Sequence, residues 1–387
     1  MATRHQITTQ ISCFLAAAAL PLLHLSAGCS SDESSSQVGG PTVTGGSDAQ
    51  AGGDGSSTTP PGPIEAVHFI GRFDRTDPAA PRFAWPGTGI LARVRGTRID
   101  VRLKDPGGEN RFAVVVDGKA PTVIKTGPAA ESYAIATGLP DGEHDVAIYK
   151  RTETEFGTVQ FLGFVQPLVD TPSPYARKIE FVGDSITTGY GIDIEADFNC
   201  DVATDEDAYA SYASIASRAA KAASSLVAWE GRGMYRNFDG SMDGLMPQLW
   251  PRTLGDQASS KWDFSSWIAD VVVVHLGTND WVAGDPGQPF SDAYAAFLGQ
   301  VRSRYPNAWV LCALSPMLSG SDRDGARQRI NGVVNAVKSR GDAKVAFVEF
   351  AQQIDTDGNG CAGHPSDVTH RKMADVLAAA LRSTIGW

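Results

Sequence analysis

The stretch KIEFVGDSITTGYG, residues 178–191, joins an apolar run to a polar, glycine-rich turn. The apolar run is typical of a strand that is covered on both faces of a parallel sheet. The turn begins with Gly183, Asp184 and Ser185, so the serine hydroxyl comes directly after the strand. In open α/β sheets, ligands bind beyond the carboxyl ends of the strands. Ser185 is therefore the first candidate functional residue.

Further apolar runs of this kind occur throughout residues 173–387, where they alternate with segments of helical pattern. Strands are predicted in KIEFVGD, SLVAWEG, DVVVVHLG, WVLCALSP and KVAFVEF. Helices are expected near residues 206–222, 290–305, 322–340 and 366–384. This alternation predicts a three-layer α/β/α domain, in which helices cover both faces of a parallel sheet.

Residues 63–172 have a different pattern, with short alternating runs such as RIDVRLKD, RFAVVVDG and EHDVAIYK. Turn sequences, including DPGGEN and LPDGEH, separate these runs at close spacing. Short strands between frequent turns are typical of an antiparallel sandwich. The sequence therefore predicts an all-β sandwich or jelly-roll domain before the α/β domain.

The N-terminal segment reads as a targeting region. Residues 1–28 have a weakly positive start, an apolar core and small residues at the end, as a signal peptide does. Cys29 then resembles a bacterial lipidation site, although a plain signal peptide with an incidental cysteine remains the alternative. The rest of the segment 29–62 is rich in Ser and Gly and is expected to be a flexible linker. We expect an exported protein, either a lipoprotein of the cell envelope or a secreted one.

Bulk composition excludes several classes of function. The formal net charge of -11 argues against nucleic acid, which needs a basic surface. No apolar run in the body of the chain reaches the length of about 18 residues that spans a bilayer, so membrane contact is expected only through a lipid anchor. No phosphate-binding loop, metal-ligand spacing or cofactor fingerprint is present, and neither a metal nor a cofactor is predicted.

Further polar groups follow the other predicted strands. Gly231 lies in EGRGMYRN, Asn279 lies in GTND, and His364 precedes the last helix. Together with Ser185 they offer a hydroxyl, an imidazole, an amide and a backbone N–H, which acyl transfer requires. Each has a structural alternative, such as a helix cap for Ser185 or a turn for Asn279. Their meeting at one sheet edge favours catalysis.

These motifs carry a resemblance to a known family. GDS at 183–185 and GTND at 277–280 resemble the SGNH (GDSL-type) hydrolases, from Lys178 to the C-terminus. With the sandwich sequence KRTETEFGTVQFLGF and the later EGRGMYRN and GHPSDVTHRKMA, the chain resembles the second carbohydrate-esterase family. That resemblance implies removal of acetyl groups from xylan- or glucomannan-type polysaccharide or oligosaccharide. The alternatives are a GDSL-type lipase or thioesterase, and an inert surface protein that binds carbohydrate.

The resemblance also implies roles for individual residues. Ser185 would be the nucleophile of an acyl-enzyme mechanism, and its own N–H would contribute to the oxyanion hole. The Gly231 N–H, favoured over that of Gly233, and the Asn279 side chain would supply the other donors. His364 would act as general base and then as general acid.

The chain departs from the family pattern three residues before the histidine. Most SGNH enzymes have an aspartate there, and this sequence has Cys361. Either a backbone carbonyl or a nearby acid, with Asp357 the first candidate, would then orient His364. Alternatively, Asp367 restores the spacing with His370 as the base. We expect His364, because it precedes Pro365 at a helix start whereas His370 falls inside the helix.

Cysteine and tryptophan positions leave further alternatives. Cys200 and Cys361 lie in polar loops, and an exported chain permits a disulfide between them without requiring it. Cys312 lies in an apolar run and is expected in the core. Trp281 follows GTND and is a candidate for stacking on a sugar ring, with packing in the core as the equal alternative.

Overall fold

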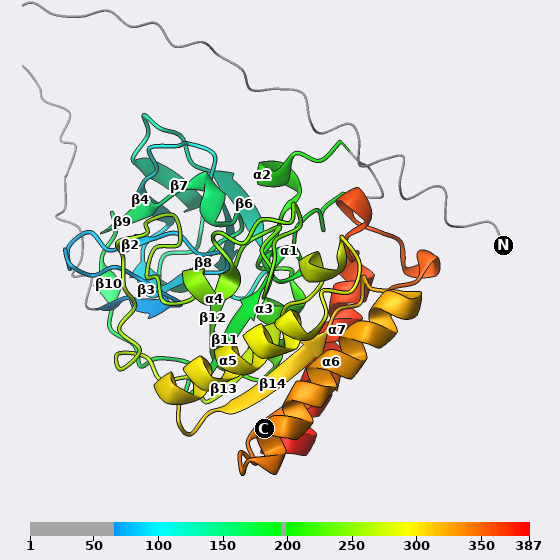
Figure 1. Ribbon diagram of the computed structural model, residues 1–387. Helices are drawn as coiled ribbons and strands as arrows, with labels where there is room; N and C mark the ends of the chain where they lie inside the picture. The colour runs from blue at the N-terminus through cyan, green and yellow to red at the C-terminus, as the bar shows by residue number, and fades with distance from the viewer. Residues whose placement is uncertain (1–65, 195–198) are drawn as a thin grey trace, which may run out of the picture. The chain divides into compact units, whose positions relative to one another are not determined.

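The computed structural model describes residues 66–194 and 199–387 (Figure 1). The signal peptide 1–28, the lipidation site Cys29 and the linker 29–62 lie outside the described residues. All described residues belong to one compact unit, Ser57–Trp387. Within the described ranges, no helix combines the length and the apolar character needed to cross a membrane.

The first part of this unit is an antiparallel sandwich. One sheet has the order β1-β3-β8-β5-β6, with β10 also paired to β3, and the other has the order β2-β9-β4-β7. Alternate residues point inward, so side chains such as Phe112, Phe161 and Phe164 form the core between the sheets. The strands are β1 His68–Ile70, β2 Arg82–Phe83, β3 Gly89–Arg95, β4 Arg98–Lys104, β5 Arg111–Val116, β6 Thr122–Lys125, β7 Ser132–Thr137, β8 Glu143–Lys150, β9 Val159–Phe164 and β10 Leu168–Val169.

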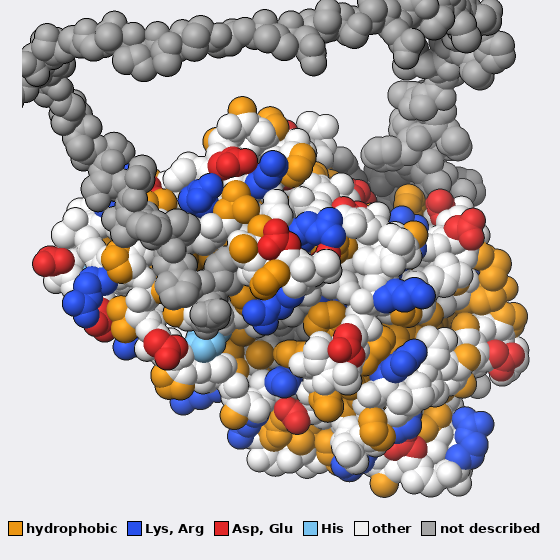
Figure 2. Space-filling model, turned by 90° about the vertical axis from the view of Figure 1, so that its left-hand side faces the viewer, with side chains coloured by type: hydrophobic (Ala, Val, Ile, Leu, Met, Phe, Trp, Pro, Cys, Tyr) orange, Lys and Arg blue, Asp and Glu red, His pale blue; other side chains and the backbone are white. Residues whose placement is uncertain are grey.

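The outer face of the sandwich is polar. Arg93 lies opposite Asp145 across β3 and β8, and Arg95 lies opposite Glu143, so each arginine forms a cross-strand ion pair. On the described part of the face in Figure 2, Lys and Arg side chains are interspersed with Asp and Glu rather than gathered in one basic area.

The second part is a three-layer α/β/α domain, as predicted. Its parallel sheet has the order β12-β11-β13-β14-β15. The helices α5 and α6 cover one face, and α3 and α7 cover the other (Figure 1). The strands are β11 Arg177–Gly183, β12 Ala222–Ala228, β13 Val271–His275, β14 Trp309–Leu314 and β15 Val345–Glu349. The helices are α1 Ser185–Thr188, α2 Val202–Asp205, α3 Tyr212–Ala219, α4 Met246–Leu249, α5 Gln288–Arg304, α6 Gly320–Ser339 and α7 Asp367–Ile385, and the short 3₁₀ turns include η3 Thr154–Phe156, η4 Asn279–Trp281, η5 Asp355–Asp357 and η6 Cys361–Gly363.

One predicted helix is shorter than expected. The sequence indicated a helix over 206–222, and α3 covers only Tyr212–Ala219. Before it, the carboxylate of Asp207 accepts hydrogen bonds from the N–H groups of Tyr209 and Ala210 and so stabilises a turn instead. After it, Lys221 has a positive φ of 50°, which ends helical geometry.

A buried ion pair joins the sandwich to the sheet. Arg72 follows β1, and its Nη2 lies 2.9 Å from the Oε2 of Glu180 in β11. The indole N–H of Trp250 donates to the other oxygen of Glu180 at 2.7 Å. Both charged side chains are fully buried, and removing one partner of such a pair costs about 3–5 kcal/mol. This contact fixes the sandwich against the domain that carries the candidate site.

Candidate active site

Three neighbouring strands bring the predicted residues to one edge of the sheet. Gly183, the last residue of β11, is level with Ala228 of β12 and with His275 of β13. The loops that carry Ser185, Gly231 and Asn279 therefore start side by side. Parallel strands align their carboxyl ends, and this produces the convergence that the sequence predicted.

Ser185 is held at the start of the short helix α1. Asp184 caps this helix, and its Oδ1 accepts a hydrogen bond from the N–H of Ile186 at 3.1 Å. Asp184 thus organises the turn that carries Ser185. A Cβ at position 183 would lie 2.0 Å from Oγ1 of Thr187, so the turn requires a glycine there. Ser185 as a whole is only 6% exposed.

The structure places His364 against this hydroxyl. The Nε2 atom of His364 lies 2.9 Å from Oγ of Ser185. On the other side of the ring, Nδ1 lies 3.0 Å from the backbone carbonyl of Cys361. A carbonyl only accepts, so Nδ1 carries the proton and Nε2 is free to accept the serine proton. The arrangement is that of a nucleophile beside its base.

Cys361 is itself held firmly. It forms a disulfide with Cys200, which settles the alternative that the sequence left open. Its N–H donates to the carbonyl of Gly191 at 2.9 Å, and its own carbonyl also accepts the N–H of His364. The ring of Tyr190 packs on the imidazole, with 4.4 Å between the ring centroids. These contacts fix the position and the tilt of His364.

The environment of His364 keeps its ring neutral. Surrounding atoms enclose the imidazole on most sides, and this burial lowers its pKa to about 4, although the Cys361 carbonyl acts in the opposite direction. A neutral imidazole is the form that accepts a proton from serine. The side chain therefore remains a competent base well below neutral pH.

The prediction that Asp357 orients the histidine is wrong. Both carboxylate oxygens of Asp357 lie 2.6 Å from Nζ of Lys372, so this acid is used in an ion pair on the surface of α7. The backbone carbonyl of Cys361, the other alternative, takes that position. His370 is not the base either, because it is fully buried and its Nδ1 accepts the N–H of Tyr212 at 3.1 Å.

The three candidate oxyanion donors have N–H groups to offer. Ser185 is the first residue of α1, so its N–H has no acceptor inside the helix. Within the described ranges the Gly231 N–H makes no hydrogen bond, whereas that of Gly233 donates to Oδ1 of Asn237 at 3.1 Å. This difference favours Gly231, as predicted. The amide of Asn279 donates one hydrogen to the carbonyl of Arg232 at 2.9 Å and has a second.

Sequence reasoning missed the residue that holds this loop in place. The buried carboxylate of Asp280 accepts the backbone N–H groups of Met234, Tyr235 and Arg236 at 2.7 to 2.9 Å. It thereby ties the loop after β12 to the loop after β13. The only signal in the sequence is its place at the end of GTND.

The stacking role considered for Trp281 is also wrong. Its side chain is 2% exposed and packs in the core between the sheet and the helices on one face. Its ring meets that of Phe290 edge to face, with 4.7 Å between the centroids. A sugar ring cannot reach a side chain that is enclosed in this way, so the core alternative holds.

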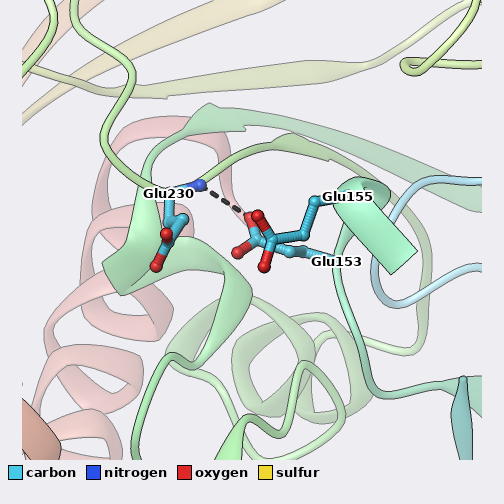
Figure 3. A group of neighbouring side chains, drawn as sticks. All are labelled: Glu153, Glu155 and Glu230. Carbon is cyan, nitrogen blue, oxygen red and sulfur yellow. Dashed lines mark hydrogen bonds between the residues drawn. The ribbon is translucent and has the colours of Figure 1, made fainter. Parts of the chain in front are cut away.

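One acidic group lies beside the candidate oxyanion loop. Glu230 directly precedes Gly231, and its carboxylate faces those of Glu153 and Glu155 from the sandwich (Figure 3). These are the residues of the described chain whose positions suit a metal ion. Sequence reasoning missed this group, because Glu230 is far in the chain from Glu153 and Glu155.

Comparison with known proteins identifies both parts of the chain. The model "Carbohydrate esterase 2 N-terminal" matches residues 69–172, and the model "GDSL-like Lipase/Acylhydrolase family" matches residues 181–372. The cellulase/esterase CelE of Acetivibrio thermocellus is 38% identical over 335 residues, which are 86% of this chain but 41% of CelE. An acetylxylan esterase / glucomannan deacetylase of Cellvibrio japonicus is 26% identical over 83% of this chain and 89% of its own length.

Solved structures agree with these matches. A family two carbohydrate esterase from Clostridium thermocellum, in complex with cellohexaose, superposes with a TM-score of 0.80 and 38% identity over 83% of this chain and 99% of that chain. A family 2 enzyme from Corynascus thermopiles has a TM-score of 0.74 and 33% identity, over 83% of this chain and 100% of its own. The chain therefore belongs to the second family of carbohydrate esterases.

Proposed function

We propose that this protein is a serine esterase that removes O-acetyl groups from polysaccharides of the xylan or glucomannan type. One observation carries the proposal, namely the 2.9 Å hydrogen bond between Oγ of Ser185 and Nε2 of His364. The names of the Cellvibrio relatives support the choice of acetylated xylan and glucomannan as substrates.

In the first half of the reaction, His364 takes the proton of Ser185 while Oγ attacks the carbonyl carbon of the acetyl group. The negative charge that develops on the carbonyl oxygen is met by the N–H groups of Ser185 and Gly231 and by the amide of Asn279. His364 then gives its proton to the departing sugar hydroxyl, and an acetyl-serine remains. In the second half, His364 activates water, which releases acetate and restores Ser185.

Within residues 66–194 and 199–387, the imidazolium that forms in each half has no carboxylate partner. Its Nδ1–H donates to the carbonyl of Cys361, which supplies a dipole instead of a full charge. The Cys200–Cys361 disulfide and the Tyr190 ring keep the Cys361 carbonyl and the imidazole in a fixed relative position. We infer that the fixed position of the imidazole compensates in part for the missing aspartate, which in most SGNH enzymes stabilises the charged histidine.

We further propose that the protein is exported and carries a lipid anchor at Cys29. The apolar segment before Cys29 supports this proposal, and a disulfide in the folded domain fits an oxidising compartment. Expression of the full chain in a bacterial host with radiolabelled palmitate tests it. Wild type should incorporate label and Cys29→Ser should not, and equal labelling of the two would contradict the anchor.

The proposed activity is tested by acetate release from acetylated xylan and acetylated glucomannan, with wild type and Ser185→Ala in parallel. Wild type should release acetate, and the variant should release almost none. p-Nitrophenyl acetate and a long-chain p-nitrophenyl ester, assayed beside them, separate this function from that of a lipase. Preference for the long chain would favour a lipase or thioesterase, and polysaccharide binding without acetate release would favour an inert binding protein.

A further inference from the structure

Three glutamates from two separate segments converge next to the oxyanion loop. Glu153 and Glu155 belong to the segment of the sandwich around η3, and Glu230 follows β12. One carboxylate oxygen from each lies within 4.8 Å of the others. Figure 3 shows the three carboxylates facing one another across the junction of the two segments.

Glu153 gives an independent indication that a ligand belongs here. Its side chain is fully buried, and its Oε2 accepts the backbone N–H of Glu230 at 2.7 Å. Its Oε1 is shielded from solvent and has no hydrogen-bond partner within the described residues. A buried carboxylate oxygen without a partner is costly, so a native structure usually provides a proton donor or a cation for it.

The positive side chains nearby are engaged elsewhere. Nζ of Lys150 donates to the backbone carbonyls of Thr152 and Glu153, at 2.7 Å each. The guanidinium of Arg232 lies over the ring of Trp229, 5.1 Å from its centroid. Within the described part of the chain, neither cation comes within 4.0 Å of the three carboxylates.

A fourth carboxylate adds to the negative charge. Oε2 of the buried Glu206 accepts the N–H of Glu153 at 2.7 Å. The carboxyl groups of Glu153 and Glu206 thus lie beside each other in a region that is closed to solvent.

We propose that Glu153, Glu155 and Glu230 bind a divalent cation, and that this cation is Ca²⁺. The donors are carboxylate oxygens alone, which Ca²⁺ prefers and which lack the nitrogen or sulfur typical of zinc sites. Glu155 is exposed and Glu230 half-buried, so water can complete the coordination sphere of six to eight oxygens. Ca²⁺ accepts variable coordination geometry, whereas Mg²⁺ requires a nearly regular octahedron.

Such an ion would connect the sandwich to the active-site edge of the sheet. Glu230 is adjacent to Gly231, whose N–H is a candidate oxyanion donor. Fixing Glu230 against Glu153 and Glu155 therefore fixes the backbone that carries this donor. This consequence rests on the proposed function, whereas binding of the ion does not.

Calcium binding is tested directly on the full chain after treatment with EGTA and removal of the chelator. Isothermal titration with CaCl₂ should show one site in wild type. Saturating Ca²⁺ should raise the unfolding temperature by about 2 °C or more. Glu155→Gln and Glu230→Gln should each weaken binding by about tenfold or more, since each removes one charged ligand. Because Glu155 is exposed, its variant should fold even where a change at buried Glu153 does not.

Glu131→Gln is the matched control, because it removes an exposed glutamate of the same sandwich that lies in surface ion pairs. Its affinity for Ca²⁺ should equal that of wild type, and so should the affinity of Ser185→Ala, which separates this test from the test of catalysis. The proposal is overturned if wild type shows no Ca²⁺ binding at millimolar concentration, or if both glutamine variants bind as tightly as wild type. Equal or tighter binding of Mg²⁺ would overturn the assignment to Ca²⁺.

Discussion

The imidazole of His364 and the carboxyl of Glu230 both lose contact with water on folding, and this burial shifts their pKa values in opposite directions. The pKa of His364 falls to about 4, so the ring is neutral and ready to accept a proton. That of Glu230 rises to about 7, so its charged form needs a partner. The same loss of solvation thus favours the neutral form of the side chain in both regions.

The carboxylates near the active site lie next to the oxyanion loop and not next to His364. No carboxylate of the described chain lies within hydrogen-bonding distance of His364, and the Cys361 carbonyl takes that position. The carboxylates of Glu153, Glu155 and Glu230 lie instead next to the loop that carries Gly231. The imidazole of His364 is therefore oriented by a backbone carbonyl, and we propose that a cation bound by the glutamates holds the loop that carries Gly231.

The largest expected effect comes from removing the base. His364→Ala should lower kcat for acetate release by about 10⁴-fold or more, because Ser185 then lacks a proton acceptor. Initial rates on acetylated xylan measure this effect, with circular dichroism as the check on folding. Calcium binding should not change. A folded variant that keeps a tenth of the wild-type rate would remove His364 from the mechanism.

Removal of an oxyanion donor should cost less. Asn279→Ala should reduce kcat by about 10²–10³-fold with little change in KM, because the amide meets charge that exists only in the transition state. Steady-state kinetics with p-nitrophenyl acetate separate the two constants. A rise in KM at unchanged kcat would instead assign Asn279 to ground-state binding.

The sequence predicted the residues whose function follows from their place after a strand. Ser185 and Asn279 stand in short motifs, and the alternation of strands and helices is enough to put those motifs at one edge. The position of His364 just before the last helix favours it over His370 as the base. The structure confirms that His364 precedes α7 and contacts Ser185.

The rest depended on contacts that no local pattern encodes. The partner of His364 is a backbone oxygen, and a carbonyl has no signature in the sequence, so the sequence left a carbonyl and an acid such as Asp357 as open alternatives. Trp281 is polar enough at its N–H to line a site, and only the packing of Phe290 shows that it is enclosed. The glutamate group combines two distant segments, so it is visible only in three dimensions.

The pH dependence sharpens the contrast between the two regions. Since the base acts in its neutral form, kcat/KM should stay nearly constant down to about pH 5 and fall near pH 4, whereas a pKa of 6.5 would already cost about tenfold at pH 5.5. The pH profile of Glu230→Gln tests whether the fall in kcat/KM near pH 4 is caused by protonation of His364. If it is, the variant should show the same fall. A limb near pH 6.5 in both proteins would contradict the lowered pKa.

The same shift has a consequence for stability. The unfolded chain protonates His364 below about pH 6.5, while the folded chain resists protonation until about pH 4, so this residue destabilises the fold as the pH falls through that window. Assays at low pH therefore need brief exposure and a parallel measurement of folding.

The smallest effect is expected at Asp357, the acid that the sequence offered as one possible partner of His364. Asp357→Asn should change kcat/KM by less than about threefold, because its carboxylate contacts Lys372 and not His364. Kinetics on p-nitrophenyl acetate are sufficient for this test. A loss of about 10²-fold or more would show that Asp357 supports the imidazole after all.

The most direct test of the account is the rate at which a fluorophosphonate labels Ser185, followed by intact mass and peptide mapping. We predict one adduct, on Ser185, with rapid labelling in wild type and Asp357→Asn and labelling slower by about 10³-fold or more in His364→Ala. Equal labelling rates with and without the imidazole, or an adduct on another residue, would show that the neutral histidine held by the Cys361 carbonyl does not activate this serine.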